Sequence, residues 1–304
     1  MAFPQFFKLF FLGLFVVFLN QWQVIAQESK PQPVSTTTPL EAEHLKDLAA
    51  QLLRHAGKAG CHKGDCTILV MNFVLADGRT SRYCMQLADE LSSEMAKQQK
   101  SVQMIDRALL QSVLERERIS AQLQNEDSVA RWLGKKLNAT AVIVGSTNRD
   151  DRGSLQLSAH LLSVSDRKRI GPSAEVSFLA SKDTADLTPT DGLSTLPSIT
   201  STASGEKTYD VHRDKGVAPP SCSYMPNPSY TDEARSAKYS GIVQEEGIVK
   251  VDGSVEPVRV VRGAPFGLNE AAFNIMVTWK CRPATINGKP VPTLVRFEFN
   301  FRLY

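Results

Sequence analysis

The last residues of this 304-residue chain alternate between apolar and polar side chains. Along one parity stand Val295, Phe297, Phe299, Phe301 and Leu303, and along the other stand Arg296, Glu298, Asn300 and Arg302, before the terminal Tyr304. A period of two, built from strong strand formers, predicts a β-strand with one buried and one hydrated face. Only an earlier strand can cover the outer edge of such a terminal strand. An uncovered edge offers unpaired N–H and C=O groups to a partner's strand, so we take residues 295–304 as the candidate binding site.

Length and charge set broad limits on the rest of the chain. Its length suits two modest domains plus tails, and its hydrophobic fraction of 42% is ordinary for globular proteins. The net charge is only +3. A nucleic-acid partner would call for a concentrated basic patch, so we expect none.

The N-terminus resembles an export signal. After Lys8, about eleven apolar residues run from Leu9 to Leu19, which is short of the roughly twenty that a spanning helix needs. We expect a signal peptide over residues 1–26, cleaved after Ala26. The alternative is an uncleaved membrane anchor over residues 3–25. Either outcome places the body of the protein outside the cytoplasm, where disulfides persist.

A flexible leader is expected over residues 27–39, followed by a first folded domain over residues 40–180. In that domain, helical spacing of apolar residues alternates with short apolar runs typical of buried strands, which predicts an α/β sandwich. Cys61 and Cys66 flank a small loop that contains His62. We favour a local disulfide over a metal site, because no second Cys/His pair lies at zinc spacing. Cys84 falls on an apolar helix face and is expected to be a buried free thiol.

The order of elements in this first domain carries a resemblance. It resembles the periplasmic domain of the curli-secretion CsgG and flagellar FlgO proteins, which serve in cell-envelope assembly and are not known as enzymes. The residues that carry it are Leu87-Ala88-Asp89-Glu90-Leu91, Ile105-Asp106-Arg107, Leu133-Gly134-Lys135-Lys136-Leu137 and Ala141-Val142-Ile143-Val144-Gly145-Ser146.

A linker over residues 181–220 is rich in Ser, Thr and Pro and is expected to be a disordered spacer. Beyond it, the C-terminal domain over residues 221–304 predicts the order αββαβ: a three-stranded antiparallel sheet with two helices on one face. We expect the second helix to run from Leu268 to Lys280, with an apolar face formed by Ala272, Phe273, Met276, Val277 and Trp279. Asp252-Gly253 predicts a tight hairpin turn of the primed type.

A second resemblance covers this C-terminal domain. Its spaced motifs resemble the C-terminal domain of TonB-family proteins. They are Pro226-x-Pro228-x-Tyr230, Glu233-Ala234-Arg235, Gly241-x-Val243, Val251-Asp252-Gly253-x-Val255, Ala271-Ala272, Trp279-x-x-x-Pro283-Ala284, Gly288-Lys289-Pro290-Val291 and the final Phe-rich strand.

The TonB resemblance implies a periplasmic protein that binds the plug and "TonB box" of outer-membrane transporters. In that family the box adds as a strand beside the domain's last strand, which corresponds here to residues 295–304. Energy transduction would add an inner-membrane proton-driven motor complex as a partner, and a second copy of the chain is a further candidate partner. The chain departs from the family: its spacer is short and Ser/Thr-rich, an α/β domain intervenes, and Tyr230 is followed by Thr231 instead of Pro. The alternative reading is therefore a non-energised envelope scaffold or docking protein.

Cys222 precedes the first helix of the C-terminal domain and Cys281 follows Trp279-Lys280, so we expect a second disulfide between them. The alternative is two buried thiols.

Nothing in the sequence indicates catalysis or a cofactor. The five histidines show no ligand or triad spacing, and no nucleophile elbow or dinucleotide loop is present. The adjacent acidic pairs Asp150-Asp151 and Glu245-Glu246 are expected to point apart as solvated charges. The protein is therefore not expected to be an enzyme.

Overall fold

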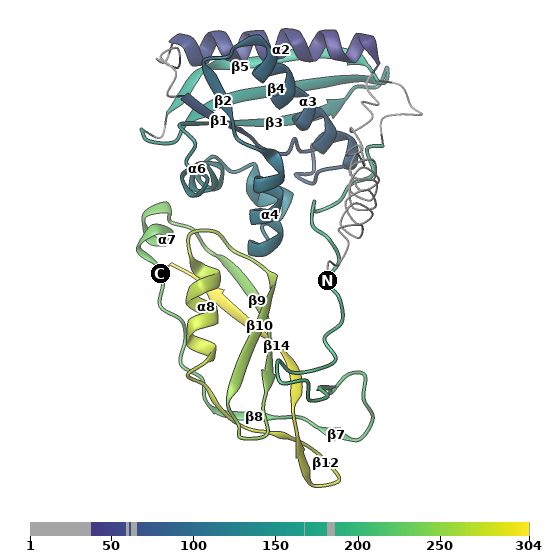
Figure 1. Ribbon diagram of the computed structural model, residues 1–304, viewed down its shortest axis with the longest axis vertical. Helices are drawn as coiled ribbons and strands as arrows, with labels where there is room; N and C mark the ends of the chain where they lie inside the picture. Colours follow the sequence, from purple (N-terminus) through teal and green to yellow (C-terminus); the bar gives the residue numbers. More distant parts are fainter. Residues whose placement is uncertain (1–37, 59–60, 62–65, 167, 181–185, 304) are drawn as a thin grey trace, which may run out of the picture. The chain divides into compact units, whose positions relative to one another are not determined.

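The structure is a computed structural model that describes residues 38–303, except 59–60, 62–65, 167 and 181–185. In the first domain, five strands form one sheet in the order β2-β1-β3-β4-β5 (Figure 1). β1 runs parallel to β2 and to β3, whereas β4 and β5 continue the sheet in antiparallel fashion. The bounds are β1 (Cys66–Val70), β2 (Val102–Met104), β3 (Ala141–Arg149), β4 (Ser154–Ser163) and β5 (Arg169–Leu179).

Helices cover both faces of this sheet. Ile68 and Val70 of β1 pack into one core with two helices, while Leu69 and Met71 pack into a second core on the opposite face. This split follows from the alternation of side chains along a strand. The first core holds α2 (Pro39–Lys58) and α3 (Arg82–Gln98), and the second holds α4 (Arg107–Glu117) and α6 (Asp127–Lys136), with α5 (Ala121–Gln124) between them in sequence. The prediction of an α/β sandwich is confirmed.

The start of α2 is fixed by hydrogen bonds between Thr38 and Glu41. The Thr38 N–H donates to Glu41 Oε2 at 2.7 Å, and the Glu41 N–H donates back to Thr38 Oγ1 at 3.3 Å. This reciprocal pair is a capping box, and Pro39 occupies the first helical position, where its missing N–H is not needed. The buried Glu41 also accepts a hydrogen bond from the Tyr83 hydroxyl at 3.0 Å, which joins α2 to α3. Pro39, which the expected leader over residues 27–39 included, is the first residue of α2, and residues 27–37 lie outside the described part of the chain.

The C-terminal domain has the predicted αββαβ order. Its sheet has the strand order β10-β9-β14-β6 (Figure 1). β9 is antiparallel to both of its neighbours, β10 and β14. The main elements are α7 (Asp232–Ala237), β9 (Gly241–Val249), β10 (Val255–Arg262), α8 (Leu268–Met276) and β14 (Thr293–Phe301). Of the short strands that the structure describes, only β6 (Tyr209–Asp210) joins this sheet. β8 (Ser221–Tyr224) pairs with β11 (Lys280–Arg282), and β12 (Ala284–Ile286) lies between β13 (Lys289–Val291) and β7 (Val217–Ala218) in a third sheet.

The second helix of this domain is shorter than predicted. It ends at Met276, and Lys280 belongs to β11, which pairs with β8. Ala272 and Met276 are buried as expected, but Phe273 and Val277 are 40% and 52% exposed. The apolar stripe is therefore narrower than the composition of the helix suggested. Trp279 is nevertheless a core residue, because the chain turns after the helix and brings the indole under the sheet.

The turn at Asp252-Gly253 is not of the predicted primed type. The Lys250 N–H donates to the Ser254 carbonyl, and only Gly253 of the loop has a positive φ, at 80°. A two-residue primed turn of type I′ needs a positive φ at both central residues, so this is a three-residue loop with glycine in the left-handed position. The Cβ that any other residue would carry at Gly253 would lie 2.1 Å from the Cys281 carbonyl oxygen. Asn287 and Gly288, by contrast, both have positive φ.

Much of the expected spacer has defined structure. Residues 186–220 include β6 and β7, and the Tyr209 N–H of β6 donates to the Pro292 carbonyl at 2.9 Å. Thr202 and Thr208 are buried, and the Thr202 N–H donates to the Glu206 carbonyl in a tight turn. The Ser/Thr-rich composition alone did not reveal these backbone pairings. Residues 181–185 lie outside the described part of the chain.

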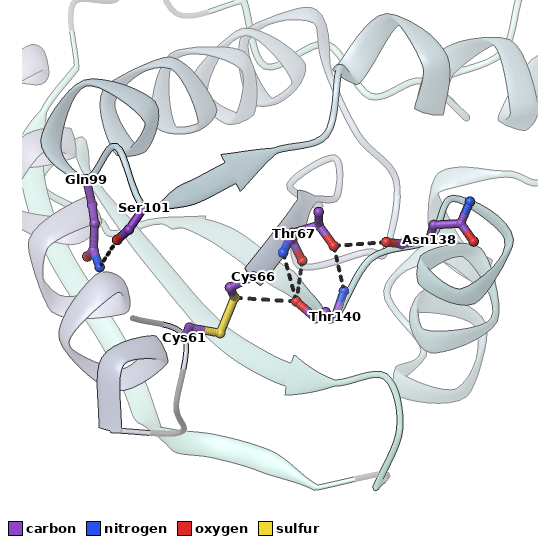
Figure 2. The surroundings of a disulfide bond; sticks show 7 residues. All are labelled: Cys61, Cys66, Thr67, Gln99, Ser101, Asn138 and Thr140. Atoms are coloured by element: carbon purple, nitrogen blue, oxygen red, sulfur yellow. Dashed lines mark hydrogen bonds between the residues drawn. A yellow bond between two sulfur atoms is a disulfide. The ribbon is translucent and has the colours of Figure 1, made fainter. Parts of the chain in front are cut away.

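Two pairs of cysteines are joined. Cys61 is bonded to Cys66, and Cys222 is bonded to Cys281 across the β8–β11 pair. Figure 2 shows that Cys66 opens β1, beside Thr140, whose hydroxyl lies 3.4 Å from the Cys66 sulfur. Thr67 and Thr140 each donate a backbone N–H to the other's hydroxyl oxygen, at 2.9 and 3.1 Å. Cys84 is a buried free thiol, as predicted.

The two disulfides should differ in their effect on stability. Cys222 and Cys281 are 59 positions apart, whereas Cys61 and Cys66 are only 5 apart. Because a longer closed loop restricts the unfolded chain more, replacing Cys222 and Cys281 by serine should lower the free energy of unfolding by about 2–4 kcal/mol. The matched Cys61→Ser/Cys66→Ser protein should lose roughly half as much. Urea unfolding measures both, and a larger loss in the short-loop variant would contradict the expectation.

A second pair of variants tests the two faces of β14. Phe299 is buried in the domain core, and the neighbouring Asn300 is exposed on the opposite face. Phe299→Ala should lower the free energy of unfolding by about 3–5 kcal/mol, because it leaves a cavity in the core. Asn300→Ala should change it by no more than about 0.5 kcal/mol. Equal losses in urea unfolding would show that the strand is not anchored through this face.

Candidate partner-binding edge

The candidate site is the outer edge of β14. Along its inner edge, β14 pairs with β9 without interruption, from Thr293 opposite Val249 to Phe301 opposite Gly241. Along its outer edge, within the described residues, the only strand partner is β6, which reaches Thr293 and Leu294. The edge from Val295 onward carries no neighbouring strand in the described part of the chain.

One hydrogen bond identifies the backbone groups that this edge presents. The Pro292 carbonyl accepts from the Tyr209 N–H of β6, so the polar groups of residue 292 face the outer edge. Backbone groups of successive residues in a strand point to opposite edges. The N–H and C=O groups of Arg296, Glu298 and Asn300 therefore face outward. Those of the odd-numbered residues face β9 and are used within the sheet.

The odd-numbered side chains fix the strand on the domain core. The ring of Phe297 meets Trp279 edge-on, with centroids 5.1 Å apart, and Phe299 lies 5.4 Å from the same indole. Phe301 meets Tyr230 edge-on at 5.8 Å. Trp279 itself is oriented by its indole N–H, which donates to the Pro226 carbonyl at 3.1 Å. Edge-to-face pairs of this kind favour one arrangement of the rings, so the strand is held in a single position.

The even-numbered side chains form a polar face. Arg296 donates to Glu246 Oε1 at 2.8 Å, and Glu298 Oε2 accepts from Gln244 at 2.9 Å. Both pairs join residues directly opposite each other in β14 and β9. These cross-strand pairs reinforce the register without closing the outer edge.

The strand is slightly shorter than predicted. β14 ends at Phe301, and Arg302 and Leu303 continue as exposed, non-strand residues. The Leu303 N–H lies 3.4 Å from Ser240 Oγ, and Arg302 Nε donates to Asn300 Oδ1 at 3.1 Å. Tyr304, also part of the predicted site, lies outside the described residues. The structure thus brings residues 295–301 together along one edge.

Sequence reasoning missed the burial of two glutamates on β9, the strand beside β14. Glu245 and Glu246 do point to opposite faces of β9, but neither is a solvated charge: both are buried. Glu246 accepts from Arg259 Nε at 2.9 Å and from Arg296, so its charge is paired twice. Glu245 has no hydrogen-bond partner for either carboxylate oxygen. Burial, and secondarily the negative charge of Glu270, raises the pKa of Glu245 to about 8.

The described residues contain no cluster of three His, Cys, Asp or Glu side chains that could hold a metal ion.

Asp150 accepts hydrogen bonds from the Arg152 and Ser154 N–H groups within its turn, and Asp151 is exposed beside it, as expected for a hairpin. His44 stacks on Phe178 with ring centroids 5.6 Å apart, and His160 lies 3.3 Å from Asp127. His62 lies outside the described residues.

Comparison with known proteins agrees with this geometry at the C-terminal end. Residues 226–303 match the family model described as Gram-negative bacterial TonB protein C-terminal. No curated protein matches the chain.

Several solved structures are similar at low identity. The LpoB C-terminal domain from Salmonella enterica is 15% identical, with a TM-score of 0.37, covering 46% of this chain and 98% of that one. The LpoB C-terminal domain from Escherichia coli is 16% identical, with a TM-score of 0.36, covering 45% and 99%. The TonB C-terminal domain of Pseudomonas aeruginosa is 20% identical, with a TM-score of 0.25, covering 31% and 93%. Residues 226–303 of this chain thus match the TonB C-terminal family model.

Proposed function

We propose that this protein acts in the periplasm as a TonB-type binding protein. In this proposal, its C-terminal domain binds outer-membrane transporters by adding a strand of the transporter to the outer edge of β14. The observation that carries the proposal is the edge from Val295 to Phe301, which has no neighbouring strand within the described residues, in a domain that matches the TonB C-terminal family. Strand addition fits this edge because the backbone groups give affinity and the alternating side chains give specificity.

The geometry of the edge supports the proposal in a second way. An edge strand offers a useful template only if it stays in place when a partner arrives. β14 is held by nine paired positions along β9 and by the rings of Phe297, Phe299 and Phe301. The outward-facing backbone groups of Arg296, Glu298 and Asn300 are therefore preorganised, which reduces the entropy lost on binding.

Proline placed on the edge gives a sharp test of strand addition. The N–H of Glu298 faces outward and is not used in the sheet, so Glu298→Pro should keep the fold while removing one donor from the edge. We expect this variant to bind peptides copied from the plug segments of the source cell's transporters at least about tenfold more weakly. The proline removes one backbone hydrogen bond to the added strand, and its ring occupies space that this strand needs. Isothermal titration calorimetry on the whole chain measures the affinity.

Glu298→Ala is the matched control, because it removes the same side chain and its bond to Gln244 but keeps the N–H. It should bind the peptides within about threefold of the parent protein, less than 1 kcal/mol. Equal binding by the proline and alanine variants would rule out the β14 edge as the site. Removal of residues 295–304 would be less informative, since it also removes the core residues Phe299 and Phe301.

A docking protein and an energy transducer would share this binding edge and differ in membrane attachment. Among the described residues, no helix is long and apolar enough to span a bilayer, and the expected signal or anchor over residues 1–26 lies outside them. We expect the intact mass of the non-reduced protein from fractionated cells to correspond to a chain beginning at Gln27. That result would favour docking without energy transduction, whereas a membrane-bound species that keeps residues 1–26 would favour the transducer.

The same mass measurement, repeated after alkylation of the denatured and unreduced protein, should show one added group. Cys84 is the free thiol, and the other four cysteines are paired. Three or five added groups would mean that one or both disulfides are absent from the cellular protein.

A further inference from the structure

Glu245 occupies an unusual position for a carboxylate. In the sheet of the C-terminal domain it lies directly opposite Phe297 of β14 on one side and Val260 of β10 on the other. It shares its face of β9 with Val243, Gly247 and Val249, which pack toward α8. Its exposed fraction is 0%, and neither carboxylate oxygen has a hydrogen-bond partner.

Among the described residues of β14, β10 and α8, no positively charged side chain lies on the face of β9 that carries Glu245. On β14 and β10, the charged residues pair with the even-numbered positions of β9 and so lie on the opposite face. They are Arg296, Glu298, Glu256, Arg259 and Arg262. On α8 the one charged residue is Glu270, whose negative charge acts on Glu245 in the unfavourable direction. Lys136 of α6 pairs with Glu270 at 3.7 Å and with Glu117, and makes no bond to Glu245. A buried, unpaired carboxylate is costly, and a carboxyl in such a place is expected to keep its proton.

We propose that Glu245 is a proton-binding residue that makes the C-terminal sheet, and with it the β14 edge, sensitive to pH. In the folded protein Glu245 is neutral at pH 7 and loses its proton near pH 8, where burial and Glu270 have moved the pKa. Loss of the proton then places an unpaired negative charge between Phe297 and α8, among the side chains that pack β14 against the domain core.

The direction of the effect on stability follows from proton binding in the two states. The folded pKa is raised above the ordinary value of 4.5 that applies to the unfolded chain. Below that value both states hold the proton and pH has no effect through this residue. Between pH 4.5 and about 8 only the folded state holds it, so the folded state loses stability as pH rises, by roughly tenfold in the unfolding equilibrium constant per pH unit. Above pH 8 the loss levels off.

Glu246 provides a control at the adjacent position. It is buried to a similar degree, but on the other face of β9, where Arg259 and Arg296 pair with it. The two residues therefore have the same chemistry, the same strand and nearly the same depth, and differ in whether the carboxylate has partners. A property that comes from burial without partners should appear at Glu245 alone.

The direct test is a titration of the glutamate side-chain carboxyl carbons by NMR in the full chain labelled with ¹³C-glutamate. The Glu245 signal is assigned as the one that disappears in Glu245→Gln. We expect it to titrate with a midpoint near pH 8. A midpoint below pH 5 would overturn the proposal, and this measurement on the unaltered protein does not depend on how well the variant folds.

A second test compares urea unfolding of three proteins at pH 5.5 and pH 8.5. Glu245→Gln should flatten the pH dependence, so that its unfolding midpoint exceeds that of the parent protein at pH 8.5 by more than it does at pH 5.5. Glu246→Gln should lower the midpoint at pH 8.5, because it removes the charge that two arginines pair with. If the unfolding midpoint of Glu245→Gln depends on pH as strongly as that of the parent protein, Glu245 is not the residue whose proton binding makes stability depend on pH.

The consequence for partner binding rests on the proposed function. If transporter peptides bind the β14 edge, the parent protein should bind them more weakly at pH 8.5 than at pH 6.5, and Glu245→Gln should lose most of that difference. Equal affinities at both values of pH, together with an NMR midpoint near 8, would restrict the effect to stability and overturn its extension to the edge. An absence of peptide binding at every pH would count against the proposed function and leave the titration result intact.

Discussion

The pairing of β14 with β9 is the interaction on which the C-terminal domain depends. It joins the last strand of the chain to the first strand of the central hairpin over nine positions. One face of this pair carries the rings that cover Trp279, and the other carries the bonds of Arg296 to Glu246 and of Glu298 to Gln244. A shift of the register by one residue would exchange these faces, so core and polar pairs specify the same register. The outer edge of β14 is defined by the same pairing, because every backbone group not directed at β9 is directed away from it.

The sequence predicted this strand, its neighbours and the fold class because the signals are local and periodic. Alternation at the C-terminus, helical spacing around Leu87 and Leu91, and short apolar runs such as residues 141–145 all translate into the observed elements. Where prediction was wrong, the deciding interactions come from elsewhere in the chain. Phe273 and Val277 are apolar, yet whether they are covered depends on which other segments pack against them, and both are exposed. β6 is only two residues long, and it is a strand because it pairs with β14, which is distant in the sequence.

The adjacent glutamates illustrate the same limit at the candidate site. Strand periodicity correctly predicts that Glu245 and Glu246 point apart, but it cannot predict that both faces are covered. Glu246 is buried because arginines from both flanking strands lie over it, and Glu245 is buried because α8 packs on its face. The one available sequence signal is that Glu245 shares its parity with Val243 and Val249, which places an acidic residue in an otherwise apolar row. Such a residue on a predicted core face is worth examining as a titrating group before it is treated as a solvated charge.

An exposed strand edge is both a binding surface and a hazard, because it accepts other edges without much discrimination. In this domain β6 covers the first two positions of β14, and charged side chains occupy the polar face of the remainder. For a second copy of the chain, the antiparallel register centred on Glu298 would use most of the free edge. It would also place the two Glu298 side chains directly opposite each other, and like charges in that position destabilise a strand pair. The charge pattern thus works against self-association in this register, while a partner strand of different sequence meets no such repulsion.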